Sequence, residues 1–187
     1  TPSPHAIIRE AANANEEWAA AQVLQSCFGG WTLKHFGSLR SPNLDANVFF
    51  RPSSNPIVAI SVVDDGSTNG VAQVIPCELT AAVDVPNSTG KRVAFLQSVA
   101  VADTARRRGI GTALVRWAET EAAARWRDGG ISELWLAIAT DNAAALTLYE
   151  QAGFETLGVR FNNMLMRKPL PSTVENIDAE ANRADVS

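Results

Sequence analysis

Three consecutive arginines lead into two closely spaced glycines in the segment Arg106-Arg107-Arg108-Gly109-Ile110-Gly111. The segment lies between an apolar, strand-like stretch at 92–101 and a helical pattern that begins at Ile110. Backbone N–H groups and the dipole at the start of a helix together bind anions, and glycines let that backbone approach phosphate oxygens closely. The pattern therefore favours a diphosphate site, and the alternative is a solvated basic turn that contains two glycines.

Two common nucleotide motifs do not fit this segment. Leu114 stands where the dinucleotide fingerprint requires its third glycine, and no Gly-Lys-Ser or Gly-Lys-Thr follows, as a P-loop requires. A kinase is disfavoured because that lysine and the metal-binding carboxylates are missing. A diphosphate site on a scaffold of another kind remains.

A second motif follows further along the chain, at 142–154, with the sequence Asn-Ala-Ala-Ala-Leu-Thr-Leu-Tyr-Glu-Gln-Ala-Gly-Phe. It resembles the Asn-x-x-Ala-x-x-Leu-Tyr-x-x-x-Gly-Phe block of the GNAT acetyltransferase superfamily. The segment 106–111 is similar to that family's Arg/Gln-x-x-Gly-x-Gly/Ala signature, which cradles the pyrophosphate of acetyl-CoA. The resemblance is firm over 96–154, and over 6–83 it rests on the order of the elements alone.

The resemblance implies a role for each matched residue. Asn142 is expected to hydrogen-bond the pantetheine or pyrophosphate arm, and Tyr149 to point at the thioester sulfur as the catalytic acid. The main chain of the strand at 99–101 is expected to hold the pantetheine and acetyl group. The full set of expected cofactor-binding residues is Val99, Ala100, Val101, Arg106, Arg107, Arg108, Gly109, Ile110, Gly111, Thr112, Asn142 and Tyr149.

Each role has a structural alternative. Asn142 alone would be read as a first-turn helix residue, and Tyr149 follows Leu146 at a spacing that also fits a core position. Arg107 and Arg108 could be simply solvated, although the 3′-phosphate is a suitable partner for them.

The chain departs from the family pattern at two places. Asp103 stands where many relatives have a proline, which should change the loop but not the phosphate site. Many relatives carry a glutamate as general base on the strand that here spans 92–101, whose inward candidates are Gln97 and Ser98. Neither side chain can take a proton near neutral pH, so the base is not identified.

The implied reaction is a direct attack of a neutral amine on the acetyl carbonyl in a ternary complex. A backbone N–H of the strand would stabilise the oxyanion, and Tyr149 would protonate the leaving thiolate. Without an obvious base, acceptors that deprotonate easily are favoured, so protein N-termini and low-pKa small amines rank above lysine. The alternative function is a catalytically weak CoA-binding module that acts as a sensor or as a subunit of a larger assembly.

The elements that must position these residues follow from the apolar pattern. Strands are predicted at 6–9, 57–63, 71–79, 92–101, 134–139, 154–159 and 162–167, and helices from 13 or 15 to 27, from 110 to 125 and from 142 to 151. The segment 31–39 is ambiguous, and 41–56 is predicted to be a loop with an apolar patch at 48–50. The predicted fold class is α/β (α+β), with a mixed, mostly antiparallel six- to seven-stranded sheet flanked by helices, and the resemblance implies a single GNAT-like domain. The resemblance implies a cofactor cleft between splayed strands four and five, at 92–101 and 134–139.

Composition sets the remaining bounds. A chain of 187 residues with 46% hydrophobic side chains predicts one globular domain, assigned to 1–170, followed by a flexible acidic tail at 171–187. The net charge of -4 argues against nucleic acid held by bulk electrostatics, and no apolar stretch reaches the roughly 20 residues of a membrane helix. No metal spacing is visible.

Cysteine usage and termini bear on the compartment. Cys27 and Cys77 are predicted to be free thiols of a reducing compartment. The histidines, His5 and His35, are remote from the motifs, so they are predicted to have surface or core roles. A start at Thr1, a long 84–92 region and the ending Leu-Met-Arg-Lys at 165–168 resemble plastid-targeted GNAT enzymes of plants and algae, so a soluble protein of the plastid stroma, or otherwise of the cytoplasm, is expected.

Overall fold

The computed structural model describes residues 6–28, 49–54 and 56–171. Its helices and strands run in the order β1 (Ile7–Glu10), α1 (Ala14–Phe28), β2 (Phe50–Pro52), β3 (Ile57–Val62), β4 (Thr68–Leu79), β5 (Arg92–Val101), α3 (Ile110–Trp126), β6 (Glu133–Ala139), α4 (Ala143–Gln151), β7 (Glu155–Arg160) and β8 (Asn163–Pro169). Short 3-10 helices, η2 (Ala81–Val83) and η3 (Asp103–Ala105), precede β5 and α3. The ambiguous segment 31–39, both histidines and the predicted tail after Pro171 lie outside the described residues.

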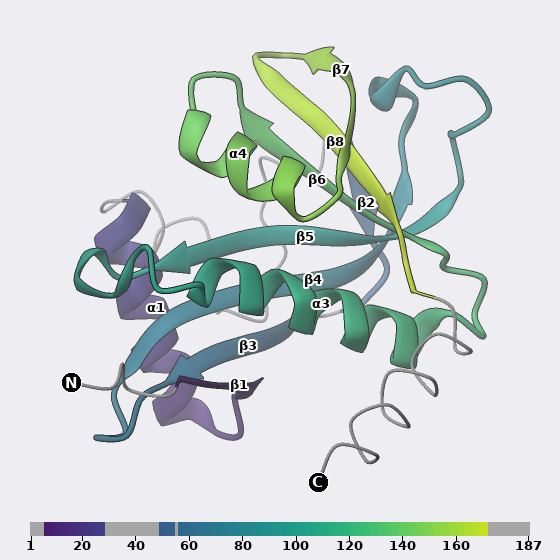
Figure 1. Ribbon diagram of the computed structural model, residues 1–187. Coiled ribbons are helices and arrows are strands. Elements are labelled where there is room, and N and C mark those ends of the chain that lie inside the picture. Colours follow the sequence, from purple (N-terminus) through teal and green to yellow (C-terminus); the bar gives the residue numbers. More distant parts are fainter. Residues whose placement is uncertain (1–5, 29–48, 55, 172–187) are drawn as a thin grey trace, which may run out of the picture.

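All the strands join one sheet, in the order β1-β3-β4-β5-β6-β8-β7, with β2 paired to β4 (Figure 1). The β5–β6 pairing is parallel and the other pairings are antiparallel, which confirms the predicted mixed, mostly antiparallel sheet. The sheet has 8 strands, so the predicted count of six to seven is too low. The missed strand is β2, which spans only 3 residues and ends in a proline, so it is too short to show alternation.

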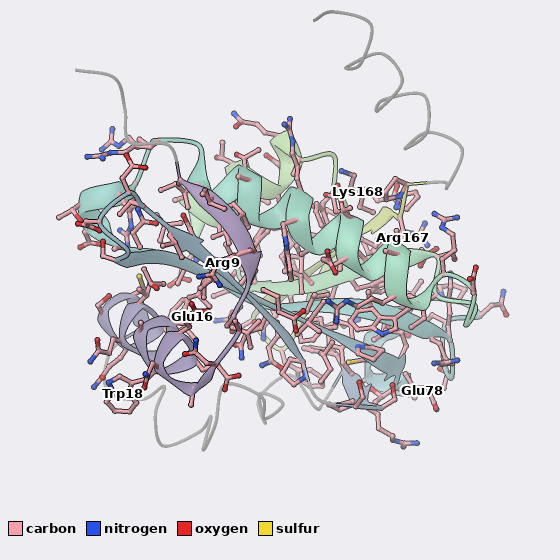
Figure 2. The ribbon with its side chains drawn as sticks, turned by 90° about the horizontal axis from the view of Figure 1, so that it is seen from below. Arg9, Glu16, Trp18, Glu78, Arg167 and Lys168 are labelled. Atoms are coloured by element: carbon pink, nitrogen blue, oxygen red, sulfur yellow. The ribbon has the colours of Figure 1, made fainter. Side chains whose placement is uncertain are left out.

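Helices cover both faces of this sheet. The residues of α3 and α4 share a core with Ala72 and Val74 of β4, whereas α1 packs on Val71 of the same strand. Successive side chains of a strand point to opposite faces, which is why neighbouring residues of β4 join different cores. Figure 2, seen from below, shows α1 and α3 on opposite sides of the strands. We call these two sides the α1 face and the α3 face.

An aromatic cluster covers the other half of the α1 face. The Phe50 and Phe95 rings stack with centroids 3.9 Å apart, and the fully buried Trp135 belongs to the same core. These rings join β2, β5 and β6, so they pack over the point where the two parallel strands meet.

The pairing of β5 with β6 is very short. It consists of Ala94 with Leu134 and Phe95 with Trp135, after which β5 continues to Val101 without a partner in β6. Figure 1 shows the two strands diverging beyond this junction. These are the fourth and fifth predicted strands, so the splay expected between them is present.

A bulge in β5 lies next to the junction. Gln73 of β4 pairs with Ser98 and Val74 pairs with Leu96, so Gln97 is the extra residue. Pro76 lies within the interior strand β4, although proline is usually confined to edge strands and bulges. It falls between the last residue that pairs with β3, Val74, and the first that pairs with β2, Cys77, where a missing N–H disrupts no pairing on that side.

Candidate active site

The three segments singled out from the sequence converge at the end of β5. A Cβ built on Gly111, in the first turn of α3, would lie 3.4 Å from Leu148 Cδ2 of α4 and 4.0 Å from Val101 Cγ2 of β5. Gly111 thus permits the start of α3 to pack closely against both neighbours. The start of α3 thus lies against β5 and α4, the two elements that carry the other predicted cofactor residues.

The start of α3 carries no side-chain cap. Its N-cap is Gly109, in the left-handed region at φ 79°, and its first turn contains no acidic residue. Helix α1 differs, because Asn13 Oδ1 accepts hydrogen bonds there from the backbone N–H groups of Asn15 and Glu16. The N–H groups of Ile110, Gly111 and Thr112 therefore have no capping side chain at the N-cap of α3, and N–H groups of this kind can bind an anion. No atom lies within 4 Å of a Cβ built on Gly109, so space is open beside it.

The three arginines before α3 are exposed but have different surroundings. Arg106 Nε donates to the Val101 carbonyl at 3.1 Å, and Arg106 Nη2 forms an ion pair with Asp103 at 2.7 Å. Its side chain therefore ties the turn to the end of β5. Arg107, at φ 59°, and Arg108 form no ion pair with any residue in the described part of the chain.

The Val101 carbonyl also accepts a hydrogen bond from Cys27 Sγ of α1 at 3.4 Å. Sequence reasoning missed this contact, because nothing in the spacing of Cys27 and Val101 indicates it. The Val101 carbonyl therefore has two side-chain donors within the protein. Both cysteines are free thiols, and Cys27 is half-buried whereas Cys77 is fully buried. Burial raises the pKa of the Cys77 thiol to about 12.

Tyr149 lies in α4 and is 6% exposed. Its ring packs edge-on against Phe154, with centroids 5.6 Å apart. Within the described ranges, no residue is hydrogen-bonded to the Tyr149 hydroxyl. Burial raises the pKa of this hydroxyl above its usual range, so it keeps its proton at any physiological pH. The residue is thus buried as a core residue is, with a hydroxyl that the surrounding core leaves without a partner.

Asn142, the first residue of the helix predicted at 142–151, is the N-cap of α4. Its Oδ1 accepts from the Ala145 N–H at 3.1 Å. The structural alternative for Asn142 is therefore real, and its side-chain nitrogen, which capping does not use, is placed on the same exposed residue for a contact to a ligand.

The two positions of β5 considered for a general base, residues 97 and 98, carry no carboxylate. Gln97 and Ser98 are both half-buried, and Gln97 Nε2 lies 3.5 Å from Gln73 Oε1. Gln73 is fully buried and was not singled out from the sequence. The available signal was a lone polar residue in the apolar run Val-Ala-Gln-Val-Ile at 71–75.

The described residues contain no group of His, Cys, Asp and Glu side chains that could hold a metal ion. They also contain no helix long and apolar enough to cross a membrane.

Comparison with known proteins places this geometry in context. The family model described as the acetyltransferase (GNAT) family matches residues 17–154. The [ribosomal protein bS18]-alanine N-acetyltransferase of Escherichia coli strain K12 is 38% identical over 69 residues, which are 37% of this chain and 44% of that protein. The chain therefore matches less than half the length of this curated relative.

Solved structures agree in fold. The crystal structure of the ribosomal-protein-S18-alanine N-acetyltransferase from Escherichia coli has a TM-score of 0.60 at 20% identity, over 92% of this chain and 98% of that chain. The PaiA N-acetyltransferase from Thermoplasma acidophilum, solved in complex with coenzyme A, has a TM-score of 0.62 at 14% identity, over 88% of this chain and 99% of that chain.

Proposed function

Because the chain belongs to the acetyltransferase (GNAT) family, we propose that it transfers the acetyl group of acetyl-CoA to a primary amine by direct attack in a ternary complex. The observation that carries this proposal is the uncapped, glycine-containing start of α3 beside the end of β5, where β5 has left β6. A diphosphate at these N–H groups leaves the pantetheine arm and thioester to lie along β5.

The cofactor contacts follow from the placement of each residue. The N–H groups of 110–112 bind the diphosphate, and the exposed Arg107 and Arg108 are suited to its charge and to the 3′-phosphate. The main chain of Val99 and Ala100 binds the pantetheine arm, and the Asn142 side-chain nitrogen donates to the same arm. Arg106 acts by holding the turn to Val101 and by its backbone N–H.

Tyr149 is the proposed general acid. Its hydroxyl holds a proton and has no hydrogen-bond partner among the described residues, so donation to a departing thiolate breaks no internal hydrogen bond. The thiolate gains the proton as the amide bond forms, and no covalent enzyme intermediate is needed.

The proposed acceptor is the α-amine of a peptide or protein N-terminus. An α-amine has a pKa of about 7.7–8.0, so about 20–33% of it is neutral near pH 7.4, whereas a lysine of pKa about 10.4 is only about 0.1% neutral. Residues 97 and 98 are glutamine and serine, so no carboxylate is present there to take a proton from the acceptor, and this favours the α-amine over lysine. The bacterial relative, by its name, acts on an alanine of a ribosomal protein, which is the same class of acceptor. No comparison supports the plastid location, which stays a prediction.

The test measures two properties of the purified protein. Calorimetry with CoA reports binding, and release of free thiol from acetyl-CoA with a peptide that begins with a free alanine reports transfer. A second peptide, with an acetylated N-terminus and one lysine, offers only a lysine amine. The rates of thiol release with the two peptides therefore compare the two acceptor classes. CoA binding without thiol release for either peptide would instead indicate the non-catalytic sensor or subunit.

A further inference from the structure

A polar strip crosses the α1 face of the sheet between two apolar cores. It consists of Gln73 on β4 with Gln97 and Ser98 on β5. On one side lies the core of α1, which includes Val71 and Ala100, and on the other lies the aromatic cluster, which includes Ile75 and Phe95. Polar side chains thus interrupt a face that is otherwise packed with apolar residues.

The bulge in β5 explains why Gln97 belongs to this strip. Phe95 and Leu96 point to the α1 face and the α3 face respectively, so strict alternation would put Gln97 on the α1 face and Ser98 beneath α3. The extra residue resets the alternation, because Ser98 pairs with Gln73, whose neighbours Val71 and Ile75 face the α1 side. Both Gln97 and Ser98 therefore come to the same face, and the Gln97 amide reaches the Gln73 amide.

The strip lies where β5 separates from β6. The last β5 residue that pairs with β6 is Phe95, two positions before Gln97. The α3 face at this point is filled by α3, α4 and Tyr149. Among the described residues, the α1 face at this point presents the half-buried polar side chains of Gln97 and Ser98, so we take this face as the side from which an amine approaches a thioester held along β5.

Burying a neutral amide such as Gln73 has a free-energy cost that hydrogen bonds must offset, and an apolar side chain would avoid it. The Gln97 Nε2 atom lies 3.5 Å from Gln73 Oε1, so the nitrogen side of the Gln97 amide faces Gln73 and its carbonyl oxygen is turned from that contact. An amide oxygen has two lone pairs, so it can accept from a substrate N–H in addition to its other contacts.

We propose that Gln97 accepts a hydrogen bond from the N–H of the acceptor amine, and that Gln73 is a positioning residue that orients the Gln97 amide. This inference rests on the proposed function and names how the same site receives its acceptor. Holding an N–H on Gln97 turns the nitrogen lone pair toward the thioester carbon. An amide carries no charge, so it stabilises an ammonium ion less than a carboxylate would, and the site selects amines that are already neutral.

The experiment uses the full chain with an alanine-terminated peptide and acetyl-CoA. Gln97→Met, which keeps the side-chain length but loses the oxygen, should raise the KM of the peptide about three- to tenfold, with CoA affinity unchanged. Gln73→Met should raise the same KM, and the double variant should be no worse than the Gln97 variant, because Gln73 acts through Gln97. Gln151→Met, at an exposed glutamine of α4, is the matched control and should behave as the wild type.

A conservative variant separates this role from a structural one. Gln97→Glu keeps an accepting oxygen, and Gln73 can turn its amide to donate to it. The peptide KM of Gln97→Glu should therefore be closer to the wild-type value than that of Gln97→Met. A carboxylate can also take the proton, so kcat/KM for the peptide should rise at a lower pH than in the wild type. A core defect would not move the pH profile.

The outcomes are distinct. If folded Gln97→Met has a peptide KM within twofold of the wild type, this proposal is overturned. The proposed function still stands in that case, provided that the wild type binds CoA and releases thiol with the peptide. If Gln97→Met does not fold, Gln97→Ala and Gln97→Glu supply the same comparison. A wild-type protein that binds CoA but acetylates no peptide amine would overturn the proposed function, and this inference with it.

Discussion

Asp103 and Arg106 form an ion pair of 2.7 Å across the turn that joins β5 to α3. The turn is the 3-10 helix η3, which begins at Asp103 directly after Ala102, whose backbone is extended at φ -54° and ψ 140°. A residue before proline favours this extended conformation, and proline is accepted at the first position of a helical turn. The ion pair therefore restrains a turn that a proline could restrain through its ring.

We accordingly expect Asp103→Pro to fold and to bind CoA within about fivefold of the wild type, since an exposed ion pair contributes only about 0.2–1 kcal/mol. Asp103→Ala, which has neither restraint, should bind CoA more weakly than Asp103→Pro. Calorimetry on the two variants makes the comparison, and equal affinities would show that the ion pair does not organise the phosphate turn.

The charge at the start of α3 can be tested with two variants of equal size. Asn and Asp both tolerate the left-handed backbone of Gly109, and a Cβ there meets no neighbour within 4 Å. Gly109→Asp should weaken CoA binding about tenfold or more relative to Gly109→Asn, because its carboxylate repels the diphosphate. Matched melting temperatures are the control for folding, and equal CoA affinities would place the diphosphate elsewhere.

Tyr149→Phe should lower turnover about 10²- to 10⁴-fold at saturating acetyl-CoA, provided that chemistry limits the rate. The ring contact with Phe154 is kept and no described residue loses a hydrogen bond, so CoA affinity and melting temperature should change little. Single-turnover kinetics give the chemical rate. A loss below about threefold would contradict the acid role, and loss of stability and affinity together would make Tyr149 a core residue only.

Stability at acidic pH should depend on Glu16. Arg9, on β1, and Glu16, on α1, face one another in Figure 2, and Arg9 Nη2 lies 2.7 Å from Glu16 Oε1. Hydrogen bonds from Arg9 and then from the Ala12 N–H lower the pKa of Glu16 to about 2, compared with about 4.3 in an unfolded chain. The stability that this carboxylate contributes is thus complete above about pH 4.3 and is lost as the pH falls toward 2.

The measurement is the melting temperature of Glu16→Gln against the wild type between pH 7 and pH 2. The difference should be largest at neutral pH and should shrink as the pH falls through that window. Glu150→Gln, at an exposed carboxylate of α4, serves as the control and should show no such convergence. A difference that does not depend on pH would show that the Glu16 charge is not the cause.

The boundary of the domain can be tested by truncation. Arg127, directly after α3, donates hydrogen bonds to the carbonyls of Leu170 and Pro171, and the Leu170 side chain is buried. A chain that ends at Pro171 should keep the wild-type melting temperature. A chain that ends at Lys168 loses the burial of a leucine, about 1.5–3 kcal/mol, and should melt several degrees lower. A large loss for the longer chain would mean that residues after 171 contribute to the fold.

Sequence patterns predicted the elements that bury a long apolar face and missed features set by pairing between distant segments. The helices α1, α3 and α4 were predictable from the helical spacing of their apolar residues. Leu114 in α3 and Tyr149 in α4 are examples, and both are buried. The bulge at Gln97 depends on how β5 aligns with β4, which no local pattern encodes. The Arg106 side chain likewise turns back to Val101, although its place in the motif suggested a ligand contact.

The short junction of β5 and β6 bears on how this scaffold can diversify. Two residue pairs join these strands, and the stacked Phe50 and Phe95 rings and the buried Trp135 pack over them. The junction is thus held by side-chain packing in the aromatic cluster as well as by its two backbone pairs. We expect substitutions in that core to change how the two strands diverge beyond the junction without a change of strand register, so the selectivity of the proposed acceptor site can change through residues of the core.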